Sequence, residues 1–197
     1  MQMFRTIKDL VPPFPARVCW GGALLCILFL WCSCSTQQKT TATQHPNRMI
    51  VLYFSATGTT ARVAQLIGVA TGAPVAEIAP TVAYTAADLD WRNSKSRSSV
   101  EMADSTCRPA IKPIDLHDAN VIYLGYPIWW DLAPRQVYTF LENIDLEGKT
   151  IIPFATSGSS TISNSVRVLQ QTYPKAVWKE GKLLNGATAA TVNAWVK

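Results

Sequence analysis

Cysteine is scarce in this sequence outside its first 34 residues. Four of the five cysteines lie in that leading stretch, and Cys107 alone falls beyond it. No C-x-x-C pair occurs in the chain. These absences exclude an internal disulfide framework and a dithiol redox motif from the body of the protein, and we expect no metal site there.

Three motifs for binding nucleotides or exposing a nucleophile are also missing. The chain has no G-x-x-x-x-G-K-[ST] loop, no G-x-G-x-x-G fingerprint and no G-x-S-x-G elbow. These absences argue against a nucleoside triphosphatase, a dinucleotide-binding domain of the usual kind and a serine hydrolase. No catalytic acid, base or nucleophile is evident either, so we expect any chemistry to depend on a bound group.

Excess charge is confined to the beginning of the chain. The formal net charge is +5, of which residues 1–48 contribute +4 and the remaining residues only +1. A body so close to neutrality has no basic stripe that could follow a phosphate backbone. The sequence therefore argues against nucleic-acid binding.

The first part of the chain has the features of an export signal. Three basic residues precede residues 18–31, which carry no charge. This run is short for a membrane span, but it has the length of a signal-peptide core. We predict an export signal over residues 1–34, followed by a polar tether over residues 35–47.

Cys34 stands directly after Ser33 at the end of this signal. A cysteine that follows a small residue in this position resembles a bacterial lipoprotein signal. We therefore predict lipidation of Cys34 and anchoring to a membrane of the bacterial cell envelope. The alternatives are a plain signal peptide and a misassigned start site, which would leave the protein in the cytoplasm.

From residue 48 onward, short apolar runs alternate with segments of helical periodicity. The expected strands cover residues 49–54, 74–78, 120–126 and 150–155, with a weaker one in 176–184, and the expected helices cover 59–70, 134–142, 162–173 and 187–196. This alternation is typical of an α/β protein with a parallel sheet. We predict one α/β domain over residues 48–197, with three layers and a doubly wound sheet of five strands.

Residues 81–111 are the least regular part of this domain. The segment is polar, contains Trp91, and offers Ser98 and Glu101 as a capping-box pattern for a short helix. Long connections of this kind are often functional. Its charged side chains are either ordinary solvated groups, or the segment folds over a bound cofactor or substrate.

The turn after the first expected strand is rich in hydroxyl groups. Residues 55–60 read S-A-T-G-T-T and precede the first expected helix. The first N–H groups of a helix lack partners and carry partial positive charge, and hydroxyls add further donors. Such a turn can hold a phosphate monoester without Lys or Arg. The alternative is that one hydroxyl merely caps the helix.

Two adjacent tryptophans follow the third expected strand. Trp129 and Trp130 lie in a loop bounded by Pro127 and Pro134. Neighbours on a loop seldom both point inward, so we expect one indole to be buried and the other to offer its face to a ligand. By analogy with nucleic-acid bases, stacking of a planar ring on indole contributes about 1–3 kcal/mol. Core or partner-surface tryptophans are the alternative.

A second turn rich in hydroxyls and glycine, residues 156–160, follows the fourth expected strand. In an open parallel sheet, the turns after strands one, three and four meet at the carboxyl edge, where ligands bind. The predicted binding residues come from all three turns and are Ser55, Ala56, Thr57, Gly58, Thr59, Thr60, Pro127, Ile128, Trp129, Trp130, Asp131, Thr156, Ser157, Gly158 and Ser159.

These motifs resemble those of the flavodoxin family. The pattern [ST]-x-[ST]-G-x-T at residues 55–60 resembles the loop that holds the FMN phosphate in flavodoxins. The stretches G-Y-P-I-W-W at 125–130 and I-I-P-F-A-T-S-G-S-S at 151–160 are similar to those of short bacterial flavodoxin-like proteins. The resemblance covers about residues 48–197 and implies the strand order 2-1-3-4-5.

FMN is the cofactor that the resemblance implies. The first loop would hold its phosphate, the tryptophan loop would pack on the isoalloxazine ring, and the third loop would line the pyrimidine side. Related sequences often have Gly where this chain has Asp131. Aspartate has less backbone freedom than glycine and places negative charge near the ring.

Three functions follow from the resemblance. The first is low-potential electron transfer to an unidentified redox partner, which we expect over an enzymatic role. The second is an NAD(P)H-dependent FMN oxidoreductase for a quinone or similar acceptor, and the third is a tethered binding module that has lost the flavin. The near-neutral charge weakens the first and the missing nicotinamide signature weakens the second, while the intact loops weigh against the third.

Overall fold

A parallel β-sheet forms the centre of the structure, a computed structural model that describes residues 48–196. The strands lie in the order β2-β1-β3-β4, and β5 and β6 both pair with the outer side of β4. Their bounds are β1 Met49–Tyr53, β2 Val75–Glu77, β3 Val121–Pro127, β4 Thr150–Thr156, β5 Val177–Trp178 and β6 Lys182–Leu183. The predicted order 2-1-3-4-5 is confirmed.

The outer edge of the sheet differs from the single weak strand expected within residues 176–184. Ile151 and Ala155 on β4 both accept hydrogen bonds of 2.8 Å from this edge segment. Pro153 lies midway between them and turns its backbone to the same side, but proline has no N–H to donate. The missing donor coincides with the break between β5 and β6, so the sheet has six strands instead of five.

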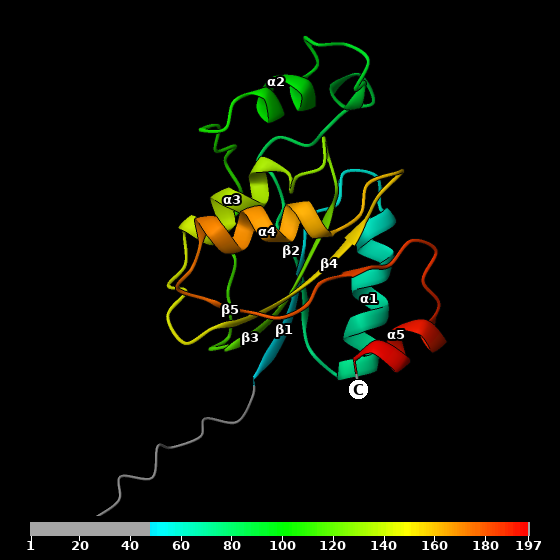
Figure 1. The fold of residues 1–197 in the computed structure, drawn as a ribbon, viewed down its shortest axis with the longest axis vertical. Coiled ribbons are helices and arrows are strands. Elements are labelled where there is room, and N and C mark those ends of the chain that lie inside the picture. The colour runs from blue at the N-terminus through cyan, green and yellow to red at the C-terminus, as the bar shows by residue number, and fades with distance from the viewer. Residues whose placement is uncertain (1–47, 197) are drawn as a thin grey trace, which may run out of the picture. The chain divides into compact units, whose positions relative to one another are not determined.

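Helices cover both faces of this sheet, which confirms the predicted three layers (Figure 1). The helices are α1 Thr59–Thr71, α2 Arg97–Ala103, α3 Arg135–Glu142, α4 Ser163–Thr172 and α5 Ala189–Trp195, with a short 3-10 helix η1 at Ala87–Leu89. One face carries α1 and α5, and the other carries α3 and α4 (Figure 1). None of the helices within residues 48–196 is both long and apolar enough to cross a membrane.

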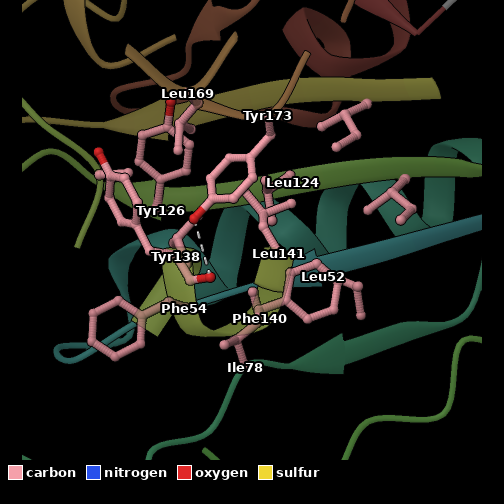
Figure 2. Packing of buried hydrophobic residues seen from close by; sticks show 14 of the residues in the cluster. Leu52, Phe54, Ile78, Leu124, Tyr126, Tyr138, Phe140, Leu141, Leu169 and Tyr173 are labelled. Atoms are coloured by element: carbon pink, nitrogen blue, oxygen red, sulfur yellow. Dashed lines mark hydrogen bonds between the residues drawn. The ribbon is translucent and has the colours of Figure 1, made fainter. Parts of the chain in front are cut away.

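Two apolar clusters hold the layers together. Val51 points into the cluster under α1, which includes Ile67, whereas its neighbour Leu52 points into the larger cluster under α3 and α4. Figure 2 shows this larger cluster, in which Tyr126 and Phe140 are almost completely buried. Successive strand residues point to opposite faces, so a strand covered on both faces needs a continuous apolar run.

The part of the connection between β2 and β3 that holds α2 lies beyond the carboxyl ends of the strands, as Figure 1 shows. The short helix expected there is present, but the predicted capping box of Ser98 and Glu101 is wrong. Ser96 is the N-cap, and its side chain accepts a hydrogen bond from the Ser99 backbone N–H. Ser98 is the second residue of the helix, is only 2% exposed and lines a cavity, so it does not cap the helix.

A buried polar cluster fastens this connection to α3. The Glu101 carboxylate accepts hydrogen bonds from Tyr84, Arg97 and Gln136. Arg135 donates to two backbone carbonyls near the end of α2, at 3.2 and 2.8 Å. Burial and the bond to the Glu101 carboxylate raise the pKa of Tyr84 well above its usual value, so its hydroxyl remains a donor at neutral pH. Arg97 donates to the Glu101 carboxylate and to the Val82 carbonyl, so its charge is paired within this cluster and not simply solvated.

The predicted export signal over residues 1–34, the tether over residues 35–47 and the predicted lipidation of Cys34 lie outside the described residues. The structure does not test them, and they stay predictions. The domain predicted to begin at residue 48 contains all the elements described above.

Candidate functional site

The three predicted loops line one cavity at the carboxyl ends of β1, β3 and β4. Its volume is about 430 Å³. Most of the predicted site residues form its wall, namely Ser55, Ala56, Thr57, Thr59, Thr60, Pro127, Ile128, Trp129, Trp130, Thr156, Ser157 and Gly158. The strand order thus brings together three turns that are far apart in the sequence.

Three predicted residues lie beside this wall and not in it. Gly58 occupies the position before α1 with φ +84°, a left-handed conformation that glycine adopts without strain. Asp131 belongs to the turn that carries the tryptophans. Ser159 borders an adjacent cavity of about 360 Å³, which shares both loop tryptophans with the main one.

Four wall residues were not among the predicted binding residues. Leu89, Trp91 and Ser98 come from the connection between β2 and β3, which therefore covers one side of the cavity. Folding of this segment over a ligand was one of the two alternatives from the sequence, which did not indicate the side chains involved. Asn185 follows β6 and exchanges two hydrogen bonds of 2.8 Å with the backbone of Ser157. The sequence gave no indication that Asn185 lines the cavity, because a single asparagine forms no recognisable motif.

The turn before α1 offers hydrogen-bond donors that nothing in the described protein uses. No side chain caps the N-terminus of α1, so the capping alternative for the hydroxyls of residues 55–60 is wrong. The Ser55 hydroxyl is shielded from solvent and has no partner among the described residues. Leaving such a group unpaired costs about 1–3 kcal/mol. The hydroxyl of Ser98, which lines the same cavity, is likewise shielded and has no partner among the described residues.

Thr60 connects the first loop to the third. Its hydroxyl lies 2.9 Å from that of Thr156, and both residues are almost completely buried. A buried hydrogen bond contributes about 1 kcal/mol, and this one fixes the start of α1 relative to the end of β4. The hydrogen bond between Thr60 and Thr156 therefore helps to set the width of the cavity at the carboxyl ends of β1 and β4.

The tryptophan loop is a tight hairpin with an unusual backbone. Trp129 and Leu132 exchange two backbone hydrogen bonds, of 3.0 and 2.9 Å. Between them, Trp130 has φ +45° and Asp131 has φ +64°. Positive φ at both central positions defines a type I′ turn, which strongly prefers Asn and Gly. Tryptophan there stores strain of about 1 kcal/mol, which is typical of functional sites.

The two tryptophans occupy different environments, but Trp129 is only partly buried, not buried as expected for one of them. Trp129 packs edge-to-face against Phe54 and Tyr84, with ring centroids 5.5 Å apart in both pairs. Trp130 is 49% exposed, although it also lines the cavity. Trp129 is therefore held in place by the core, while the face of Trp130 is free for contact.

No charged side chain lines the main cavity. Its polar character comes from hydroxyls, the Asn185 amide and the backbone, and its apolar character from indole and aliphatic groups. Within residues 48–196, no three His, Cys, Asp or Glu side chains converge in a way that would hold a metal ion. The wall therefore combines uncharged hydrogen-bonding groups with aromatic and aliphatic surface.

Comparison with known proteins gives a family for residues 48–197, where a family model described as Flavodoxin matches. A solved structure of a candidate flavoprotein from Bacteroides eggerthii is 54% identical, with a TM-score of 0.73, over 76% of this chain and 95% of that one. A candidate flavoprotein from Bacteroides uniformis is 55% identical, with a TM-score of 0.74, over 76% of this chain and 97% of that one.

A more distant flavoprotein from Lactobacillus acidophilus is 16% identical, with a TM-score of 0.58, over 77% of this chain and 99% of that one, and supports the fold alone. No curated protein matches the chain. The chain belongs to the flavodoxin family. Because the matches cover nearly all of both Bacteroides chains, which were solved as folded proteins, we expect residues 48–197 to fold by themselves.

Proposed function

We propose that this flavodoxin family member binds FMN in the cavity and acts as a redox protein. The unpartnered hydroxyl of Ser55, beside the uncapped N-terminus of α1, is the observation that carries the proposal. Together with an indole-lined wall, it matches a ligand with a phosphate at one end and a planar ring at the other. The L. acidophilus flavoprotein, which has the same fold, was solved in complex with FMN.

Each of the three loops would contact a different part of the ligand. Residues 55–60 would hold the phosphate through hydroxyl and backbone N–H donors, aided by the helix dipole. Residues 127–131 would pack against the ring, and residues 156–159 would line its polar edge. No Lys or Arg is needed, which agrees with the uncharged wall of the cavity.

FMN, when bound, supplies one- and two-electron chemistry, and the protein tunes how readily the electrons are taken up. The carboxylate of Asp131 lies in the turn beside the cavity and would disfavour added negative charge on the ring. A tenfold preference for the oxidised cofactor lowers a one-electron potential by about 59 mV. We therefore propose low-potential electron transfer as the primary role.

An FMN-dependent oxidoreductase that uses NAD(P)H and a quinone-type acceptor is the second candidate. Trp91 and Trp130 border two further cavities next to the proposed flavin site, which offers room for a small molecule. Anaerobic addition of NADH or NADPH to the FMN-loaded protein separates the two roles. Rapid loss of flavin absorbance supports the enzyme, whereas an unchanged spectrum supports the carrier.

Reconstitution of residues 48–197 with FMN tests the proposal itself. We expect a yellow protein, and we expect Trp130→Ala to weaken FMN binding about tenfold through lost stacking. Val69→Ala, on the exposed side of α1 and far from the cavity wall, is the matched control. A protein that stays colourless after reconstitution would instead support a binding module without flavin.

For the leader, we propose lipidation at Cys34 and attachment to the cell envelope. The support is the sequence alone, with its uncharged run followed by cysteine. In a bacterial host, the full chain should appear in the membrane fraction, and Cys34→Ser should release it. If Cys34→Ser stays in the membrane fraction, the lipid anchor is wrong.

A further inference from the structure

Two exposed tryptophans border the proposed FMN site from different segments of the chain. Trp91, on the connection between β2 and β3, is 64% exposed, and Trp130 is 49% exposed. Both line the main cavity and the two cavities beside it. Large apolar side chains that gather at an opening without being buried indicate a binding surface.

The cavity between these indoles on the α2 side has a chemistry of its own. Its volume is about 350 Å³, and it is walled by Trp91, Arg92, Ser94, Ser99, Met102, Ala103 and Trp130. The Arg92 guanidinium carbon lies 4.5 Å from the centre of the Trp91 ring. No carboxylate within residues 48–196 lies within 4.0 Å of that guanidinium. A cation thus stands beside an aromatic wall without a carboxylate partner.

This charge distinguishes the cavity from its neighbour. The main cavity has no charged side chain in its wall, whereas the cavity on the α2 side has Arg92. Indole faces and the Met102 side chain favour a flat apolar ring, because sulfur and aromatic groups are polarizable. Arginine presents a planar fork of donors that suits a carboxylate or sulfonate.

We propose that this cavity is a second binding site, which takes a planar aromatic anion such as a quinone that carries a sulfonate or carboxylate. The inference rests on the proposed function in one respect, since a redox ligand here would lie next to FMN with Trp130 shared between the two sites. Binding of the anion itself depends on Arg92 and Trp91 and does not depend on the flavin.

The experiment uses naphthalene-2-sulfonate, which is planar, anionic and not reducible, titrated by calorimetry into FMN-loaded residues 48–197. Two other compounds each remove one feature: 2-naphthol is planar and uncharged at pH 7, and cyclohexanesulfonate is anionic but not planar. We expect each of these to bind about tenfold more weakly, because each loses either the charged contact or the stacking.

Variants then assign the contacts. Arg92→Gln should weaken naphthalene-2-sulfonate about tenfold and leave 2-naphthol unchanged. Lys95→Gln removes an exposed cation of the same loop that does not line the cavity, and it should change neither. Trp91→Ala should weaken both aromatic compounds about tenfold.

Several results would overturn the proposal. These are the absence of naphthalene-2-sulfonate binding, equal binding to Arg92→Gln, and displacement of FMN by naphthalene-2-sulfonate, which would assign both tryptophans to the flavin site. If FMN itself does not bind, the same titrations are run on the unloaded protein. Binding that depends on Arg92 would then uphold the second site while the proposed function fails.

Discussion

Ser55 differs from Ser165 in what its hydroxyl contacts. The Ser165 hydroxyl lies 3.1 Å from that of Tyr126 and donates to the Ile162 carbonyl at 2.9 Å. The Ser55 hydroxyl has no partner among the described residues, although it is equally shielded from water. An unpaired buried hydroxyl is destabilising, and such exceptions are expected at functional sites.

Replacing these two serines should separate binding from stability. Ser55→Ala should leave the free energy of unfolding of the FMN-free domain unchanged or slightly raised, because no internal hydrogen bond is lost, while FMN affinity falls about tenfold. Ser165→Ala should lower the free energy of unfolding by about 1–2 kcal/mol, since it leaves the Tyr126 hydroxyl unpaired. Urea unfolding and FMN titration measure both. Destabilisation by Ser55→Ala without any loss of affinity would contradict the assignment.

The backbone at Asp131 leads to a second prediction at this scale. Asp131 has φ +64°, which aspartate tolerates and alanine adopts at a cost of about 1 kcal/mol. Asp131→Ala should therefore lower the free energy of unfolding by about 1 kcal/mol, whereas Asp131→Gly should leave it unchanged or raise it by less than that. Chemical unfolding of the FMN-free domain measures the free energy of unfolding of both variants and so tests this order of stability. If the Asp131→Ala variant has a free energy of unfolding at least as high as that of Asp131→Gly, the turn does not have the left-handed backbone seen here.

The hydroxyl-rich turn and the paired tryptophans could be predicted from sequence because each motif lies within a few consecutive residues. The sequence could not show which hydroxyl oxygen has no hydrogen-bond partner, because the partners come from distant parts of the chain. Thr60 meets Thr156 across two strands, and Ser55 meets nothing. Trp91 and Ser98 were missed as wall residues because a long irregular connection places them there.

Among the elements, the connection between β2 and β3 depends most on polar contacts. Within it, Arg108 donates two hydrogen bonds, of 2.9 and 2.8 Å, to the carboxylate of Glu142 at the end of α3. The Arg108 guanidinium holds the pKa of Glu142 below its ordinary value of 4.5. The Glu142 side chain is 42% exposed, so water screens the pair and its contribution is at most about 1 kcal/mol.

The lowered pKa fixes the pH range in which this contact acts. A carboxylate whose pKa is lower in the folded state stabilises that state above its unfolded pKa of 4.5, and the effect is lost as pH falls through the folded value. Glu142→Gln should lower the free energy of unfolding at pH 7 by up to about 1 kcal/mol, and the difference from the unmodified domain should shrink as pH falls below 4.5.

Glu147→Gln is the matched control, because Glu147 is exposed and forms no ion pair within residues 48–196. Urea unfolding between pH 3 and pH 7 measures both variants. A difference for Glu142→Gln that persists or grows at low pH would show that the carboxylate does not act through Arg108.

Strand order could be predicted from sequence because apolar periodicity and loop chemistry agree along the chain. Two local details could not. The edge strand breaks opposite Pro153. The sequence does not show whether the backbone of Pro153 faces this edge, and the missing N–H interrupts the pairing only if it does. Ser96 caps α2 in place of Ser98, because packing against the cavity, not the local pattern, selects among nearby serines.

At the scale of the whole molecule, the sheet determines where function can lie. Its carboxyl edge gathers the loops after β1, β3 and β4, while the connection before β3 closes one side of the cavity. The opposite edge carries no comparable set of hydroxyl-rich turns in the described residues. A near-neutral domain also lacks the strong charge that steers typical flavodoxins to their partners.

The central claim is that hydroxyl and amide donors at residues 55–60 hold a phosphate while indole covers the attached ring. The most direct measurement is the affinity of residues 48–197 for FMN and for riboflavin, which differs only in lacking the phosphate, by quenching of flavin fluorescence. We expect FMN to bind at least about 100-fold more tightly, because several charge-assisted hydrogen bonds are lost with riboflavin. Equal affinities for the two flavins, or no binding of either, would contradict the account.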